Sequence, residues 1–337
     1  MDVTLTVWAV TVGAVLGLIA LDFFTVSKNP HEVSMKEATW WSVFYIGIAI
    51  AWGGLIWWYA GSQYGVEYYA GWLVEKSLSV DNLFVFVIIL SRFAVPTIYY
   101  QKVLLFGILF ALVLRSIFIA VGAAMLAYFS WTFLLFGAVL IWTAVQLARH
   151  RNEDPDVEDN KLVSFARRRL PMADDWHGGR LSVKVDGRRL LTPLFLVMIA
   201  IASTDILFAL DSIPAVYGIT SEPYIVFAAN AFALLGLRAL FFLLRGLLDK
   251  IVYLSIGLAV ILGFIGIKLI LTYLHEQWPD VFPKIPTAAS LAFIVLVLVV
   301  ASVASWLKVR QDPAAKAHAG AMRASKHKGE PMPEADS

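Results

Sequence analysis

The sequence predicts an all-α protein that crosses a membrane about nine times. Of its 337 residues, 60% are hydrophobic and 15% are charged, whereas average soluble domains have roughly 45–50% and about 25%. The mean hydropathy is +0.74. Apolar stretches recur along the chain at the length of about 20 residues that a bilayer core requires. These observations exclude a soluble globular enzyme.

Nine apolar stretches make up this prediction. The first is too long for the core of a signal peptide and has no Lys or Arg before it, so it is expected to be a retained span. In chain order the stretches are Val3–Phe24, Trp41–Ala60, Tyr69–Leu90, Val103–Ala127, Trp131–Ala148, Thr192–Gly218, Tyr224–Leu244, Ile251–Leu274 and Ile285–Leu307.

The basic residues are distributed unequally between the two sides of this topology. The odd-numbered loops and the C-terminal tail carry 22 Lys and Arg, and the opposite side carries 1. By the positive-inside rule, the N-terminus is expected outside and the C-terminus in the cytoplasm. The formal net charge is only +2, so we expect a lipid bilayer and not a nucleic acid as the partner.

Two polar segments are expected on the cytoplasmic side. Residues 149–191 form a loop within the transmembrane domain 1–307, and the loop contains an acidic run at 153–159. That run could be a metal-sensing patch, although solvated charge is the preferred interpretation. The loop ends in an alternating pattern around Asp186–Gly187, which predicts a β-hairpin. Residues 308–337 are rich in Ala, Pro and charge and are predicted to be disordered.

Ionisable side chains occur inside the predicted spans, where each costs roughly 2.5–3.5 kcal/mol at a helix centre. They must therefore pair with one another or face a wet cavity. Asp22 lies near the cytoplasmic end of its span and could reach the interface. The nine residues are Asp22, Glu75, Lys76, Asp81, Arg115, Asp205, Asp211, Arg238 and Lys268.

The carboxylates show a repeated spacing. Glu75 and Asp81 are six residues apart in the third stretch, as are Asp205 and Asp211 in the sixth. Six helical residues separate two side chains by about 120° and about 9 Å, whereas seven return nearly to the same stripe. Glu75 with Asn82, and Asp205 with Ser212, are therefore each expected on one stripe of their helix. Each acidic helix therefore offers several oxygen ligands to one side. The predicted ion site consists of Glu75, Asp81, Asn82, Asp205, Asp211 and Ser212.

The stretches that follow the two acidic helices also match. Leu112–Phe118 corresponds to Leu235–Phe241, with Arg115 and Arg238 in register. Stretches three to five therefore resemble a copy of stretches six to eight, inverted in the membrane. Inverted repeats are typical of secondary transporters, which bind substrate near the midplane. Pro214 could break the sixth helix and free a backbone carbonyl.

Carboxylate, amide and hydroxyl oxygens suit hard cations such as Mg²⁺, Ca²⁺ and Mn²⁺. A zinc or copper site is not expected, because the chain has no Cys and its histidines lie outside the spans. No resident cofactor is expected. The histidines are His31, His150, His177, His275, His318 and His327.

A structural alternative remains open. Lys76, Arg115, Arg238 and Lys268 could neutralise most of the acids and leave an ion-pair network that only fixes the bundle. Transport is the preferred interpretation, because intramembrane acids repeated in inverted register usually mark an ion pathway. The two arginines are expected to be counter-ions and not ligands.

Five segments occur in a characteristic order along the chain, together with Asp22 in the first span. They are Gly71–Phe86, Thr192–Phe195, Thr204–Ala215, Gly236–Phe242 and Leu258–Lys268. Together they resemble the TerC/Alx family of bacterial membrane proteins.

The resemblance implies a multi-pass inner-membrane protein of the LysE-type transporter superfamily. It implies roles in tellurite resistance, alkaline-pH response, manganese efflux and metal homeostasis, and an ion path through the six site residues. One position departs from the family, which commonly has Glu where this chain has Ala202.

The favoured hypothesis is an exporter of Mn²⁺ or a similar divalent cation, coupled to protons, and not an enzyme. An intramembrane aspartyl hydrolase is less favoured, because the Tyr-Asp and Gly-x-Gly-Asp signatures of such proteases are missing. The third hypothesis is a non-transporting scaffold linked to tellurite resistance or to maturation of exported proteins.

Overall fold

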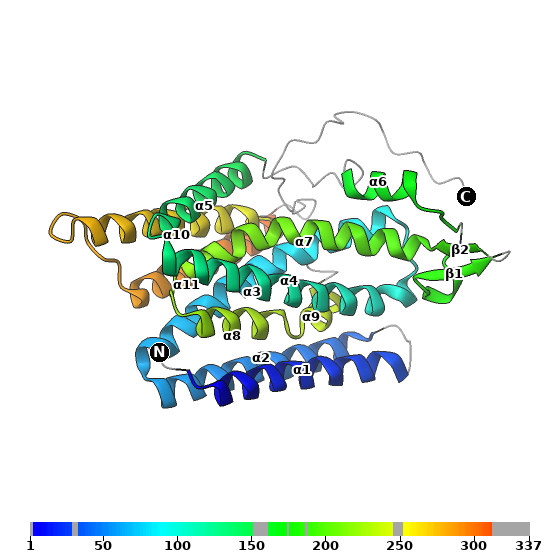
Figure 1. Cartoon of the computed structure of the whole chain (residues 1–337), viewed down its shortest axis with the longest axis horizontal. Coiled ribbons are helices and arrows are strands. Elements are labelled where there is room, and N and C mark those ends of the chain that lie inside the picture. The colour runs from blue at the N-terminus through cyan, green and yellow to red at the C-terminus, as the bar shows by residue number, and fades with distance from the viewer. Residues whose placement is uncertain are drawn as a thin grey trace.

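The structure is a computed structural model that describes residues 3–28, 33–150, 161–173, 175–185, 188–244 and 252–311. It is a helical bundle with a single small hairpin among these residues (Figure 1). The helices are α1 (Leu5–Lys28), α2 (Met35–Ala60), α3 (Ser62–Arg92), α4 (Tyr100–Tyr128), α5 (Thr132–Arg149), α6 (Lys161–Arg169), α7 (Pro193–Tyr217), α8 (Pro223–Leu234), α9 (Leu237–Leu244), α10 (Leu254–Gln277) and α11 (Thr287–Gln311). The strands are β1 (Ser182–Val185) and β2 (Arg188–Leu191), and two short 3₁₀ turns lie at Thr97–Tyr99 and His177–Gly179.

The all-α membrane architecture is confirmed. Seven helices in the described residues are long and apolar enough to cross a bilayer, and the bent pair α8–α9 could be an eighth span. The helix α3 falls outside this set because Glu75, Lys76 and Asp81 interrupt its apolar sequence. Each of the nine predicted stretches coincides with a helix or with the bent pair, but the count of nine spans stays a prediction.

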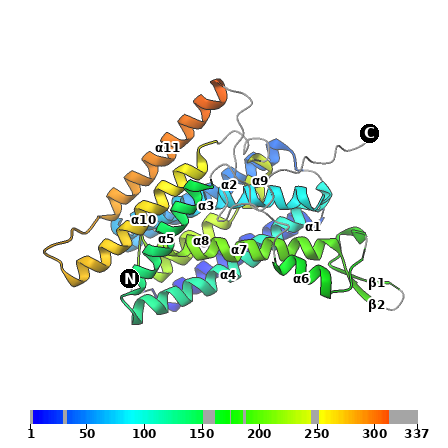
Figure 2. The same cartoon turned by 90° about the horizontal axis from the view of Figure 1, so that it is seen from above.

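The centre of the bundle is formed by α3, α4, α7 and α8. Each of α3 and α4 packs against both α7 and α8, while α5 packs along α10. Figure 2 shows α5, α10 and α11 as one group, and Figure 1 shows α1 and α2 along another side of the bundle. A two-fold axis that relates α3–α5 to α7–α10 would pair α3 with α7, α4 with the bent helix α8–α9, and α5 with α10. Each of these pairs is in contact. The inverted repeat itself stays a prediction.

The loop between α5 and α7 contains the expected hairpin and one unexpected helix. Strands β1 and β2 pair antiparallel, with Ser182 opposite Leu191, and the predicted turn at 186–187 lies outside the described residues. The helix α6 was not predicted, and it packs against α7 with Val163 and Ala166 buried. The acidic run at 153–159 and the tail from 312 also lie outside the described residues, while α11 continues past the predicted boundary at 307 to Gln311.

The seventh predicted stretch is bent, which the sequence analysis did not expect. The axes of α8 and α9 differ by 41°, and Gly236 at the break has a φ of +76°, which favours glycine. A Cβ at Gly236 would also lie 2.6 Å from the Cβ of Tyr45 on α2. The matching residue in α4 is Val113, and α4 continues through it. Pro214, in contrast, stays within the last turn of α7 and does not end the helix.

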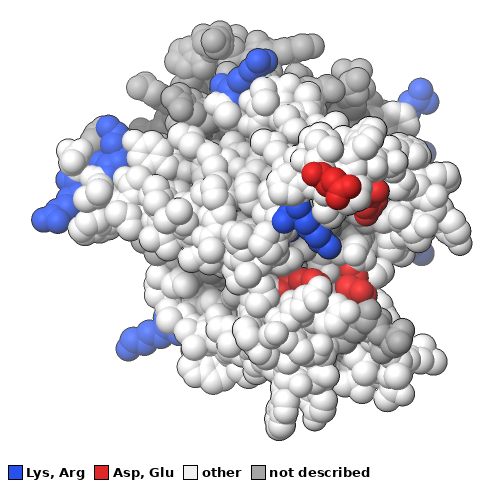
Figure 3. Space-filling model, turned by 90° about the vertical axis from the view of Figure 1, so that its left-hand side faces the viewer, with Lys and Arg blue, Asp and Glu red and all other residues white. Residues whose placement is uncertain are grey.

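The two ends of the bundle differ in charge. We call the end that carries β1 and β2, where α7 begins, the hairpin end, and the end where α7 finishes the far end. Among the described residues, the hairpin end exposes mainly basic side chains, with Asp175 beside them; the basic ones include Arg92, Arg169, Lys184, Arg188 and Arg189. The far end exposes Glu276, Asp280 and Lys284, and Figure 3 shows acidic side chains on both sides of a basic one there.

Helices α5 and α10 are in close contact at Gly266, so a side chain at this position is expected to destabilise the fold. A Cβ there would lie 2.9 Å from the carbonyl oxygen of Gly137 and 2.9 Å from Cγ1 of Ile141. We expect Gly266→Val to destabilise the fold by about 1–3 kcal/mol through overpacking. Thermal unfolding in detergent should show a lower Tm. The control Gly13→Ala, at a position with nothing within 4 Å, should leave the Tm unchanged or raise it slightly. Equal effects of the two substitutions would contradict this packing.

Candidate functional site

The centre of the predicted ion site is an arginine between two acidic helices. Arg115 on α4 forms an ion pair through Nη1 with Oε1 of Glu75 on α3, and its Nη2 lies 3.9 Å from Oδ1 of Asp205 on α7. Arg115 and Glu75 are fully buried, and Asp205 is nearly so. The direct packing of α3 and α4 on α7 therefore brings acids of both predicted repeats to one guanidinium.

Polar neighbours on α3 extend this cluster. With the amide of Asn82 oriented so that both its groups are satisfied, its oxygen accepts from Nη2 of Arg115 at 3.0 Å, and its nitrogen donates to the Leu78 carbonyl. The hydroxyl of Ser79 donates to Oε1 of Glu75 at 3.5 Å. The helical stripe that joined Glu75 with Asn82 in the sequence is thus confirmed by their common contact with Arg115.

The second acid of each helix forms another part of the site. Asp211 is buried, Asp81 is partly buried, and they lie close enough for their charges to interact. The charge of Arg115 also acts on Asp211. Repulsion between the two carboxylates favours a proton or a cation between them.

Several buried oxygens of the predicted site residues have no hydrogen-bond partner. Within the described part of the chain, this holds for Oε2 of Glu75, Oδ2 of Asp205 and Oγ of Ser212. Buried polar atoms are nearly always satisfied in folded proteins, and exceptions often mark a site for a ligand or water. However, no group of three or more His, Cys, Asp or Glu in the described residues is close enough to hold a metal ion. The four predicted acids thus form two adjacent groups, Glu75 with Asp205 and Asp81 with Asp211, and not one closed cage.

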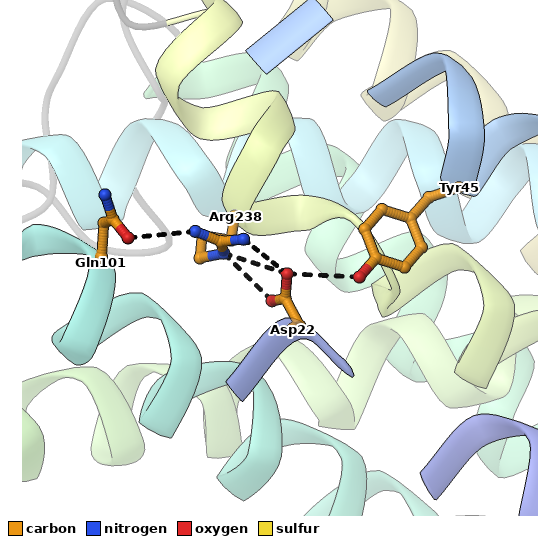
Figure 4. A network of polar contacts seen from close by, with 4 residues as sticks. All are labelled: Asp22, Tyr45, Gln101 and Arg238. Atoms are coloured by element: carbon orange, nitrogen blue, oxygen red, sulfur yellow. Dashed lines mark hydrogen bonds and ion pairs between the residues drawn. The ribbon is translucent and has the colours of Figure 1, made fainter. Parts of the chain in front are cut away.

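The other buried charges are used elsewhere. Arg238 on α9 binds the Asp22 carboxylate of α1 through Nη2 at 2.6 Å and through Nε at 3.0 and 3.2 Å (Figure 4). Its Nη1 donates to Oε1 of Gln101 at 3.2 Å, and the hydroxyl of Tyr45 donates to Asp22. Asp22 is therefore held inside the bundle and does not need to reach the interface. Arg238 does not serve as a counter-ion to the central acids, although it is in register with Arg115.

The two lysines also differ from the neutralising role that the structural alternative gave them. The ammonium of Lys76 donates to two backbone carbonyls at the end of α8. The charge of Lys268 on α10 interacts with that of Glu67 on α3. Arg115 is therefore the one basic side chain, among those singled out in the sequence, that contacts the central acids. Its guanidinium contacts Glu75 and Asp205, and its charge also acts on Asp211, which in turn interacts with the charge of Asp81.

Glu67 is a buried acid that the sequence analysis missed. Its oxygens accept from Oγ1 of Thr220 at 2.6 Å and from Nε2 of Gln63 at 3.1 Å, near the far end. The predicted span began only at Tyr69, whereas α3 begins at Ser62 directly after Gly61. No proline lies between Ser62 and Tyr69, and this is the signal that would have found it, although Gly65 weakens the signal.

Ala202, where the resemblance leads one to expect Glu, lies away from the Arg115 contacts. Its side chain lines an apolar hollow of about 200 Å³ between α4 and α7, together with Gly107, Phe110 and Met198. The alanine therefore continues an apolar surface at this position.

Comparison with known proteins decides the family. The sequence model described as "Integral membrane protein TerC family" matches residues 60–312, which is most of the chain. The chain belongs to the TerC family. As a TerC family member it is a multi-pass integral membrane protein in contact with lipid.

Bacterial relatives match this TerC protein over nearly its whole length. "Uncharacterized membrane protein STKORF319" of Myxococcus xanthus is 41% identical over 93% of the chain and 95% of its own length. "Uncharacterized membrane protein Rv2723" of Mycobacterium tuberculosis is 46% identical over 90% of the chain and 80% of its own length. "Putative membrane-bound redox modulator Alx" of Escherichia coli is 35% identical over 88% of the chain and 92% of its own length. No solved structure matches the chain.

The Asp22–Arg238 pair predicts a strong non-additive effect on stability. Arg238→Gln alone leaves a buried carboxylate without its guanidinium, and we expect it to cost about 3–5 kcal/mol. Asp22→Asn combined with Arg238→Gln removes both charges, so the double variant should recover much of that loss. The measurement is thermal unfolding of the four proteins of the cycle. If the double variant loses as much stability as the two single variants together, the pair has no coupling energy.

Proposed function

We propose that this TerC protein exports a divalent cation, most simply Mn²⁺, across the bacterial inner membrane. The observation that carries the proposal is the charge imbalance around Arg115. Glu75, Asp81, Asp205 and Asp211 lie on two packed helices with one guanidinium among them. Uncompensated buried charge is costly, so protons or cations must supply the remaining positive charge.

The ligand chemistry supports a hard cation. The candidate ligands are carboxylate oxygens, the amide of Asn82 and the hydroxyl of Ser212. Such oxygens are the ligands of Mg²⁺, Ca²⁺ and Mn²⁺, whereas thiolates and imidazoles favour zinc and copper. Ca²⁺ and Mg²⁺ are the alternative cargoes.

Arg115 has a defined part in this proposal. It links Glu75 on α3 to Asp205 on α7. A cation that enters must compete with the guanidinium for these carboxylates. Because a protonated carboxylate is a poor ligand, metal and protons compete as well, and metal binding should release protons. The same acids can therefore exchange protons for metal when the predicted repeats expose them first to one side and then to the other.

The distribution of surface charge supports a direction. Among the described residues, exposed basic side chains predominate at the hairpin end, whereas the far end exposes Glu276 and Asp280 beside Lys284. Under the positive-inside rule the hairpin end, with the C-terminus, faces the cytoplasm and the N-terminus faces outward. The cation would then enter from the hairpin end and leave at the far end.

The buried ion pairs favour a second candidate, a non-transporting scaffold. Arg115 ties α3, α4 and α7 together, and Arg238 ties α1, α4 and α9. A scaffold could act in tellurite resistance or in the maturation of exported proteins. It explains the pairs, but it leaves the surplus of acids without a role. A direct path for tellurite is disfavoured, because carboxylates repel an oxyanion.

The name of the Alx relatives raises redox modulation. This chain contains no cysteine, so a redox role here would have to act without thiols. Redistribution of a metal ion such as Mn²⁺ is one way in which a membrane protein without thiols could change cellular redox state. We propose a carrier, and not an enzyme, as the function that uses the acids.

Uptake of Mn²⁺ into inside-out membrane vesicles tests the proposal. Energised vesicles with the wild-type protein should accumulate Mn²⁺, and a protonophore should abolish the accumulation. Asp81→Asn and Asp211→Asn should each reduce the rate of Mn²⁺ uptake by about 10–100-fold or more. Loss of a group that supports a metal site typically has an effect of this size.

The matched control is the double variant Asp22→Asn with Arg238→Gln, which removes a buried charge pair outside the acid cluster. It should retain most of the uptake when the vesicles contain equal amounts of folded protein. Equal rates for wild type and the two Asp→Asn variants would rule out the acid-site mechanism. Absence of uptake in wild-type vesicles would favour the scaffold.

A further inference from the structure

Three helices of the bundle centre meet at Gly71 on α3. A Cβ at this position would lie 3.2 Å from Cγ1 of Val216 on α7 and 3.3 Å from Cβ of Ala229 on α8. The missing side chain therefore lets the three helices come into van der Waals contact. This contact fixes the height of each helix relative to the other two.

Two buried oxygens without partners lie one turn from this contact. Glu75 follows Gly71 by four residues, and Ser212 precedes Val216 by four. Four residues cover about 6 Å and return nearly to the same face of a helix. α3 runs from the far end toward the hairpin end and α7 runs in the opposite direction, so both side chains lie on the hairpin side of the contact. In the described part of the chain, neither Oε2 of Glu75 nor Oγ of Ser212 has a hydrogen-bond partner.

An unpartnered amide on α8 lies in the same region. Asn230 directly follows Ala229, its side chain is 1% exposed, and neither its oxygen nor its nitrogen has a hydrogen-bond partner among the described residues. It lies one turn beyond Val226, which packs in one apolar cluster with Val74 of α3 and Ile213 of α7. Because α8 begins near the far end, that turn leads toward the hairpin end along the face that meets α3 and α7. The amide is therefore on the same side of the three-helix contact as the two unpartnered oxygens, within about one turn of them.

A buried amide without hydrogen bonds is costly, and a leucine of nearly the same shape would avoid that cost. Such exceptions often mark a site for a ligand. A cation site here also needs ligands other than carboxylates, because the described residues contain no group of three or more His, Cys, Asp or Glu that could hold a metal ion. Amide oxygens are among the usual ligands of hard divalent cations.

We propose that the amide oxygen of Asn230 is a ligand of the exported divalent cation and completes, from α8, a site that Glu75 and Ser212 form on α3 and α7. This inference rests on the proposed function and deepens it, because it adds a third helix and a neutral ligand to the acid site. A carboxylate binds either a proton or a metal ion, whereas a neutral amide oxygen binds the metal and does not compete for protons. Asn230 therefore favours metal over protons where the two compete.

Thermal unfolding of the purified full-length protein tests the inference, with and without Mn²⁺. In a chelator, Asn230→Leu should have the Tm of the wild type or a higher one, because it removes a polar group that has no partner. Mn²⁺ should raise the Tm of the wild type in a saturable manner. Asn230→Leu should need a Mn²⁺ concentration about tenfold or more higher for the same rise.

Two further variants separate a ligand from a packing residue. Asn230→Asp keeps an oxygen at the site, so it should still bind Mn²⁺, and it should lose affinity more steeply as the pH falls because the new carboxylate takes up a proton. Ser42→Ala is the matched control, since the Ser42 hydroxyl on α2 is also buried without a partner among the described residues but lies on a helix that carries no predicted site residue. It should leave the Mn²⁺ response unchanged.

A metal-free Asn230→Leu protein that does not fold, or whose Tm is clearly lower than that of the wild type, would overturn the inference, because the amide would then have a structural partner. Equal Mn²⁺ responses of the wild type and Asn230→Leu would also overturn it and leave the proposed export standing. A wild-type protein whose Tm no divalent cation raises would instead remove the proposed export and this inference together.

Discussion

The ion pair between Arg115 and Glu75 is the interaction around which the bundle is organised. Both side chains are fully buried, and Asp205 approaches the same guanidinium from α7. In a low-dielectric interior these charges must compensate one another or unfold the site. The close packing of α3, α4 and α7 follows from this requirement, since each helix contributes one of the three side chains. The surplus of carboxylates near the guanidinium connects the fold to the proposed ion-carrying function.

The second arginine shows how one repeated sequence feature can serve two different purposes. Arg238 matches Arg115 in the sequence, but the turn at Gly236 carries it away from the acids and toward Asp22. The first helix of the chain is thereby fastened to α9. The same turn exposes the carbonyls that Lys76 occupies. One glycine thus accounts for a structural ion pair and for the backbone carbonyls that bind the Lys76 ammonium.

Much of this structure could be predicted from the sequence, because lipid imposes strict patterns. Apolar length located the helices, alternation around Asp186–Gly187 located the hairpin, and helical spacing placed Asn82 with Glu75. What failed depends on contacts between distant residues. The partner of Arg238 lies 216 positions away, and no local pattern specifies it. The bend at Gly236 could have been predicted, because a glycine stands there where the matching position of the continuous helix α4 has Val113.

Equilibrium binding of Mn²⁺ to the purified protein distinguishes a cation carrier from a scaffold, with wild type measured beside Asp81→Asn and Asp211→Asn. We expect saturable binding by the wild type, release of protons on binding, and loss of binding in both variants while their folds remain intact. Mg²⁺, Ca²⁺ and Zn²⁺ titrated in the same way identify the preferred ion, and Zn²⁺ should not be preferred. A wild-type protein that binds no divalent cation, with variants that are merely less stable, would rule out the acid-site mechanism and leave a bundle fixed by ion pairs.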